Sequence, residues 1–130
     1  MLKDFVKAEK PQDEELKQRI REAGEKLAAQ QNQIKEHKIP VLVLMEGWGT
    51  AGKGSLIGEV IKYLDPRFFK VAAMNVPTEE EKRKPFLYRY FQKIPEAGKF
   101  MFLDTGWMDE ITRQRLNGEM DDKVLSLIHI

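Results

Sequence analysis

The chain has 130 residues, a length typical of one domain, and 42% of them are hydrophobic, which is enough for a core. Its 22 basic and 21 acidic residues leave a net charge of +1, so bulk charge does not favour nucleic acid. It contains no cysteine, its longest apolar run is only 41–45, and 1–4 lack the core of a signal peptide. We therefore expect a cytoplasmic protein without nucleic-acid or membrane partners.

The first half of the chain predicts a helix, a strand and a second helix. Residues 1–12 show no clear period and form a lead-in, whereas apolar residues in 13–38 recur at helical spacing up to Pro40. The unbroken apolar run in 39–45 favours a parallel strand that helices cover on both faces. A glycine-rich turn follows, and then a helix with apolar residues on one face as far as Leu64.

The second half predicts two more strands with helices between and after them. Residues 68–74 and 99–104 are strand-like, and the residues from Thr78 to Glu81 form a capping box that predicts a helix start. Pro85 divides this helical region into two short pieces, and 109–116 predicts a last helix. The order of the elements implies right-handed crossovers and a parallel sheet.

The glycine-rich turn carries the clearest chemistry. Residues 47–53 fit the pattern G-x-x-x-x-G-K between a buried strand and an amphipathic helix, as a phosphate-binding P-loop requires. Glycines let backbone N–H groups face phosphate oxygens, and the positive end of the helix dipole adds to them. Lys53 supplies a point charge for the phosphates. The alternative interpretation of residues 47–53 is a glycine turn with a purely structural role. The expected phosphate-binding residues in this loop are Gly47, Gly49, Thr50, Ala51, Gly52, Lys53, Gly54 and Ser55.

A second motif is an acid at the end of a strand. Four apolar residues precede Asp104, which is the form of a Walker B strand whose aspartate holds the metal. The alternative is an aspartate that caps the next helix. Gly54 stands where a P-loop has the magnesium-binding Ser or Thr, and Ser55 is one place late. We therefore expect Lys53 and Asp104 to be catalytic, and Asp104 and Ser55 to be weak ligands of Mg²⁺.

Basic residues cluster between these two motifs. One interpretation is that they form a basic surface that binds an anionic chain substrate. For residues 82–84 we prefer the alternative, a helix face exposed to solvent. Arg89, between Tyr88 and Tyr90, is a further candidate for phosphate binding. The fold class is thus α/β, a P-loop three-layer fold whose parallel sheet has flanking helices.

Three strands are fewer than such sheets usually have, so the sheet is expected to be incomplete. Residues 39–124 would form the N-terminal part of the phosphotransferase domain. Residues 125–130 read like translated sequencing-adapter DNA and are expected to be a non-native tail, with a native apolar end as the alternative.

Together these segments resemble the polyphosphate kinases of the second type. The family pattern runs E-G-x-D-A-A-G-K-G-G, L-x-P-R, P-T/S-x-E-E, F-L-W-R, P-x-x-G and D-R-S-W-Y. The chain has matching segments at 46–55, 64–67, 77–80, 86–89, 95–98 and 104–108. The resemblance implies transfer of phosphate between polyphosphate and AMP or a nucleoside diphosphate, with Mg²⁺. It also implies lid helices and later strands beyond Gly118.

Four of the departures from that pattern bear on the chemistry. The loop aspartate is Gly49, the Arg-Ser pair is Thr105-Gly106, and the Tyr is Met108. Such losses are similar to those in the N-terminal half of tandem polyphosphate:AMP phosphotransferases, whose second half carries the chemistry. The alternatives are a non-catalytic half that pairs with an active one, and an unrelated P-loop kinase of small molecules. As partners we expect a second homologous domain or another copy of the chain, and we expect the chain alone to be inactive.

Overall fold

The computed structural model describes residues 13–119, 121 and 123, so the expected lead-in 1–12 and tail 125–130 lie outside the described residues. The elements follow one another as helices and strands of an α/β fold. They are α1 (Asp13–Glu36), β1 (Val41–Leu44), α2 (Lys53–Ile61), the 3₁₀ helix η2 (Pro66–Phe68), β2 (Phe69–Ala72), α3 (Glu79–Lys82), α4 (Tyr88–Phe91), β3 (Phe100–Leu103) and α5 (Trp107–Leu116). Within the described part of the chain, none of the helices combines the length and the apolar character needed to cross a membrane.

The three strands form one parallel sheet in the order β1-β3-β2. The register places Leu44 beside Leu103, and Ala72 beside Leu103 on the other side. Two crossovers therefore bring the last strand into the centre, and β1 and β2 flank it. The α/β class and the parallel sheet predicted from the sequence are confirmed.

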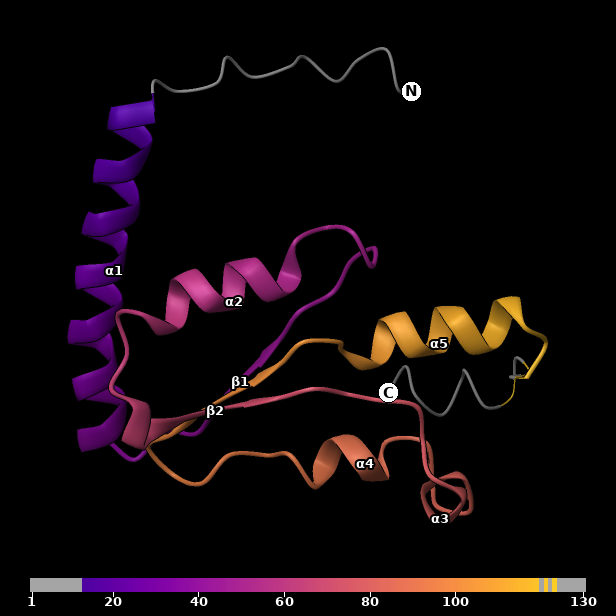
Figure 1. Cartoon of the computed structure of the whole chain (residues 1–130). Helices are drawn as coiled ribbons and strands as arrows, with labels where there is room; N and C mark the ends of the chain where they lie inside the picture. Colours follow the sequence, from indigo (N-terminus) through magenta and orange to yellow (C-terminus); the bar gives the residue numbers. More distant parts are fainter. Residues whose placement is uncertain (1–12, 120, 122, 124–130) are drawn as a thin grey trace.

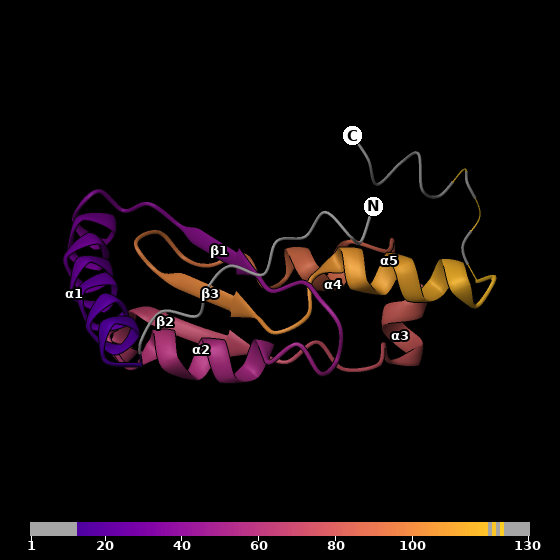
Figure 2. The same ribbon diagram turned by 90° about the horizontal axis from the view of Figure 1, so that it is seen from above.

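Helices cover both faces of the sheet and its two ends (Figures 1 and 2). In Figure 1, α2 lies over one face and α4 beneath the other. In Figure 2, α1 lies by the starts of the strands, whereas α3 and α5 lie by their carboxyl ends, beyond the arrowheads. The carboxyl ends are the edge at which α/β sheets bind ligands.

The core lies between the sheet and the helices α1 and α2. Phe100 and Phe102 on β3 are buried with Ile57 and Leu64. The rings of the two phenylalanines are stacked, with their centroids 6.0 Å apart. Leu103, on the opposite face by the alternation of a strand, is 0% exposed. A continuous apolar strand is needed here because both of its faces are covered.

A polar contact between α1 and the turn after α2 fixes the long helix. The side chain of the buried Gln31 accepts from the N–H of Asp65 at 2.8 Å and donates to its carbonyl at 3.3 Å. The Asp65 carboxylate accepts from the Arg67 N–H at the start of η2. Hydrogen bonds from Arg67 lower the pKa of Asp65 to about 2. The Leu-Asp-Pro-Arg segment, which follows α2, therefore starts η2 and anchors α1.

The capping box predicted before the first short helix is present. The Thr78 side chain accepts from the Glu81 N–H, and the Glu81 side chain accepts from the Thr78 N–H. The division at Pro85 also holds, since α3 and α4 are separate four-residue helices on either side of it.

Gly24 is the point at which α1 approaches Tyr63 most closely. A Cβ atom added at Gly24 would lie 2.4–2.5 Å from three atoms of the Tyr63 ring. We expect Gly24→Ala to lower the free energy of unfolding by about 1–2 kcal/mol, because overpacking outweighs the gain of about 1 kcal/mol in helix propensity. Denaturant titration of both proteins measures the difference.

Gly58 in α2 is the matched control for this substitution. An added Cβ would have no neighbour within 4 Å there. Gly58→Ala should therefore raise the stability by roughly 0.5–1 kcal/mol through propensity alone. Equal gains in the two variants would contradict the close packing of α1 on Tyr63.

Candidate functional site: a P-loop with a carboxylate partner

The loop between β1 and α2 has the backbone that its glycines permit. Gly47 has φ +141° and Gly52 has φ +82°, values that residues with a Cβ rarely adopt. The Ala51 N–H donates to the Trp48 carbonyl at 2.9 Å and closes a turn inside the loop. Gly52 is the N-cap of α2 and provides no side-chain cap. The first N–H groups of α2 therefore face the loop and can bind an anion.

Lys53, the first residue of α2, folds back over the loop. Its ammonium group donates to the carbonyls of Gly47 and Trp48, the latter at 3.2 Å. It also lies 3.5 Å from Oδ2 of Asp109, and the Lys53 side chain is only 14% exposed. These contacts hold the charge at the centre of the loop, as the P-loop motif predicts for its lysine.

Asp104 follows β3, the strand directly beside β1. Its Oδ1 accepts from the Met74 N–H after β2 at 3.0 Å, and its own N–H donates to the Ala72 carbonyl. The N-cap of α5 is Gly106, so Asp104 does not cap that helix. Asp104 thus lies at the edge of the sheet that bears the loop, with Oδ1 held on the β2 side.

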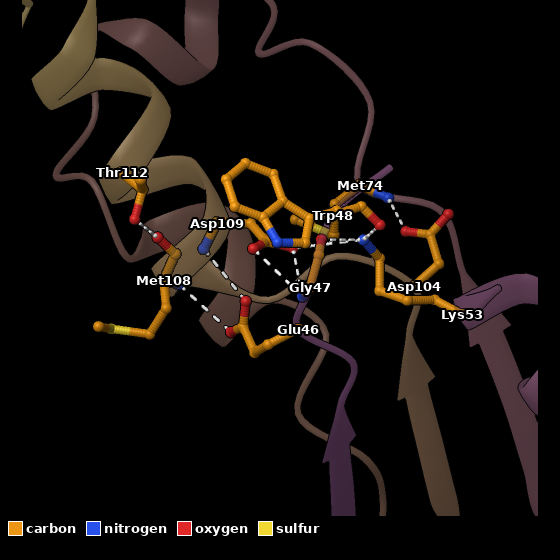
Figure 3. A network of polar contacts seen from close by, with 9 residues as sticks. All are labelled: Glu46, Gly47, Trp48, Lys53, Met74, Asp104, Met108, Asp109 and Thr112. Carbon is orange, nitrogen blue, oxygen red and sulfur yellow. Dashed lines mark hydrogen bonds and ion pairs between the residues drawn. The ribbon is translucent and has the colours of Figure 1, made fainter. Parts of the chain in front are cut away.

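Two carboxylates tie the loop to α5, and sequence reasoning missed both (Figure 3). Glu46, just before the loop, accepts from the N–H groups of Met108 and Asp109 at 3.3 and 3.1 Å. Asp109 in turn accepts from the Gly47 N–H, with both of its oxygens 3.3 Å from that nitrogen. An acid just before the loop and an acid in the first turn of the last helix were the available signals.

Gly106 leaves the space that Glu46 fills. A Cβ atom at Gly106 would lie 1.9 Å from Oε1 of Glu46 and 2.6 Å from its carboxyl carbon. The side chain of Glu46 could not stay in place beside any other residue at 106. The departure from the family pattern at this position therefore has a steric consequence inside the chain.

Arg89 lies in a different place from the loop. It is buried, donates to the Asn75 carbonyl, and its Nε has no partner among the described residues. It lines a cavity of about 450 Å³ to which none of the residues 47–55 contributes. The lining residues are Val76, Pro77, Glu81, Lys82, Lys84, Phe86, Arg89, Glu110, Arg113, Gln114 and Glu119.

The charges in this cavity are partly paired. Burial would raise the pKa of Glu110, but hydrogen bonds from Arg113 and Gln114 outweigh burial and lower the pKa. Arg113 donates to Glu110 at 2.5 and 3.0 Å, which raises the pKa of its guanidinium. Arg89 forms none of the ion pairs found among the described residues, although its charge also helps to lower the pKa of Glu110.

The residues offer a sparse set of metal ligands. The described part of the chain contains no group of three or more His, Asp or Glu residues placed to hold a metal ion. Mg²⁺ in phosphotransferases commonly uses one or two carboxylates and takes its other ligands from phosphates and water. The Asp104 carboxylate, at the end of the strand next to β1, fits this minimal arrangement, and Ser55 is exposed at the start of α2.

Two solved structures share this architecture. A polyphosphate kinase 2 from Arthrobacter aurescens TC1 is 28% identical over 82% of the chain, with a TM-score of 0.75, and the match covers 40% of that structure. A protein assigned as a polyphosphate kinase 2 from Pseudomonas aeruginosa PA01 is 26% identical over 94% of the chain, with a TM-score of 0.81, and the match covers 26% of it.

Sequence comparison gives relatives of the same kind. The ADP-polyphosphate phosphotransferase 3 of Rhizobium meliloti is 31% identical over 76% of the chain. The polyphosphate:AMP phosphotransferase of Pseudomonas syringae pv. tomato is 34% identical over 65% of the chain. The matches span only 35% and 17% of the lengths of these two relatives. The model of the family Polyphosphate kinase 2 (PPK2) matches residues 10–128, and the chain therefore belongs to the PPK2 family.

Proposed function

We propose that the chain forms the phosphate-binding part of a polyphosphate:nucleotide phosphotransferase. The observation that carries the proposal is the uncapped start of α2 beneath a glycine loop, with Lys53 at its centre and Asp104 on the next strand. In the reaction, the terminal P–O–P bond of polyphosphate breaks. The phosphoryl group then forms a new bond to a phosphate oxygen of AMP or of a nucleoside diphosphate.

The loop would bind and orient the polyphosphate end. Its N–H groups and Lys53 would stabilise the charge on the transferring group, and catalysis of this kind consists mainly of positioning and electrostatics. Asp104 would hold Mg²⁺ with Ser55, and the ion, when bound, would neutralise phosphate charge. Because residue 49 is a glycine and adds no carboxylate to that of Asp104, phosphates and water would supply the remaining ligands of the ion.

The acceptor would occupy the cavity lined by Arg89. The cavity opens among α3, α4 and α5 and contains an arginine whose Nε is buried without a partner. An acceptor phosphate in the cavity would pair with the guanidinium of Arg89, which lines it. Arg89 would then bind phosphate, as expected from the sequence, but that of the second substrate and away from the loop.

A non-catalytic role as one half of a tandem enzyme is the second candidate. The replacements at Gly49, Thr105 and Gly106 favour it, because they remove a carboxylate and a bidentate guanidinium. In that case the chain would hold a phosphate chain or pair with an active domain. Pairing with a second homologous domain or another copy, and a cytoplasmic location, stay predictions.

Binding of tripolyphosphate tests the proposed function. Lys53→Ala should weaken binding about ten- to a hundredfold, because a charged hydrogen bond contributes roughly 1.5–3 kcal/mol. Isothermal titration calorimetry of the two proteins gives the ratio of dissociation constants.

Lys62 is the matched control on the same helix. It is exposed and pairs only with Glu59 in the ion pairs of the described residues. Lys62→Ala removes the same charge far along α2 and should leave the affinity within about twofold. Equal losses in the two variants, or equal affinity of Lys53→Ala and the wild type, would remove Lys53 from the phosphate site.

A further inference from the structure

Asp109 is a carboxylate placed where a P-loop receives an anion. Its two oxygens accept from the Gly47 N–H, and its Oδ2 lies 3.5 Å from the Lys53 ammonium. A backbone N–H of the loop and the loop lysine are the two kinds of group that bind phosphate in this motif. In Figure 3, Asp109 and Lys53 both point toward Gly47 and Trp48 at the start of the loop.

The position of Asp109 is enforced by the rest of the network. Glu46 accepts from two N–H groups at the start of α5, one of which belongs to Asp109 itself. In this position the Glu46 carboxylate fills space that a Cβ at residue 106 would need. With glycine at 106, the carboxylate of Glu46 binds the N–H groups in the first turn of α5 and holds this turn beside the loop. The side chain of Asp109, in the same turn, then lies against the Gly47 N–H.

We propose that Asp109 sets the phosphate affinity of the loop by competing with phosphate for Lys53 and the Gly47 N–H. The inference rests on the proposed function, since it assumes that the loop binds phosphate. A ligand that binds only when Asp109 has moved away has its apparent affinity reduced by the fraction of molecules in that state. Asp109 thus determines the affinity by occupying both Lys53 and the Gly47 N–H.

The distances make the competition feasible. Contacts of 3.3 Å to a backbone nitrogen are longer than the usual 2.9–3.0 Å, so the carboxylate is a weak ligand of the loop. A polyphosphate end carries more charge and more acceptor oxygens than one carboxylate, and it can replace each contact that Asp109 loses. Phosphate would therefore displace Asp109 at a cost in affinity.

Asp109→Asn separates the charge from the shape of the side chain. The amide oxygen can still accept from the Gly47 N–H, but it has no charge to hold Lys53. We expect the dissociation constant for tripolyphosphate to fall about tenfold, measured by calorimetry in chelator at about 0.15 M salt. The unliganded variant should melt at a lower temperature than the wild type, because an ion pair is lost.

Two further variants define the mechanism. Glu59→Gln removes one exposed negative charge from α2 and should leave the affinity unchanged, which excludes a general charge effect. The double variant Lys53→Ala/Asp109→Asn should gain less affinity over Lys53→Ala than Asp109→Asn gains over the wild type, because Lys53 carries part of the competition. Asp109→Ser repeats the test with a smaller side chain.

The outcomes distinguish this inference from the proposed function. Weaker or equal binding in Asp109→Asn, while Lys53→Ala still loses affinity, overturns the competition and leaves the phosphate site intact. A loss seen only with Mg²⁺ makes Asp109 a metal ligand and also overturns it. If neither Asp109 variant folds, the residue is structural and the inference fails. Absence of any effect of Lys53→Ala refutes the proposed function itself.

Discussion

Leu103→Ala is expected to lower the free energy of unfolding by about 3–5 kcal/mol, a large share of the 5–15 kcal/mol typical of a domain. Leu103 is 0% exposed on the central strand, and its carbonyl accepts from the Met45 N–H just before the loop. Truncation would leave a cavity under the edge of the sheet that bears the site. Urea or guanidinium titration, followed by circular dichroism, measures the loss.

Val71 on the edge strand β2 is the control for this substitution. It is 45% exposed, and it lies in the same sheet beside Phe102. Val71→Ala should cost below about 1 kcal/mol, since little apolar area is lost. If Leu103→Ala cost no more than Val71→Ala, the core would not be centred on β3 as the burial indicates.

The parts of the fold that the sequence predicted depend on local patterns. The apolar run of β1, the capping box at Thr78 and the break at Pro85 each involve neighbouring residues, and the structure has all three. The two turns of α1 that carry Leu16 and Ile20 do not follow the packing that their pattern predicts. Their spacing continues the stripe of the buried Gly24 and Gln31, but both residues are more than 40% exposed, because the burial of α1 begins only at Gly24. Periodicity finds a stripe but does not say how far a neighbour extends along it.

The carboxylate network could not be predicted for a different reason. Glu46 and Asp109 are 63 residues apart, and their contact depends on the order of the strands and on the missing Cβ at Gly106. Sequence reasoning treated Gly106 as the loss of a serine, whereas the structure gives the glycine a steric role. The cavity that Arg89 lines could not be predicted from the sequence either, since it forms only where α3, α4 and α5 pack together.

Catalysis gives the largest expected effect. We expect the 130-residue chain to transfer phosphate from polyphosphate to AMP, ADP or GDP at least about a thousandfold below the 1–100 s⁻¹ of kinases, since an arginine at the transferring group alone contributes roughly 10³–10⁵. Gly49 provides no carboxylate for Mg²⁺, Thr105 cannot make bidentate hydrogen bonds to phosphate, and Lys53 is held by Asp109. A coupled luminescence assay of ATP formation measures the rate for ADP.

Restoring the missing groups tests the cause of that low rate. A Cβ at Gly49 would have open space, so Gly49→Asp should be tolerated, whereas Gly106→Ser would displace the Glu46 carboxylate. The double variant Gly49→Asp/Thr105→Arg should therefore gain activity by at least about tenfold, and adding Gly106→Ser should weaken the contacts of Glu46 with the start of α5. Glu59→Gln serves as the inert control. Turnover of about 1–100 s⁻¹ in the unmodified chain would show that Ser55 and Asp104 suffice for the metal and would refute the loss of function that we assign to positions 49 and 105.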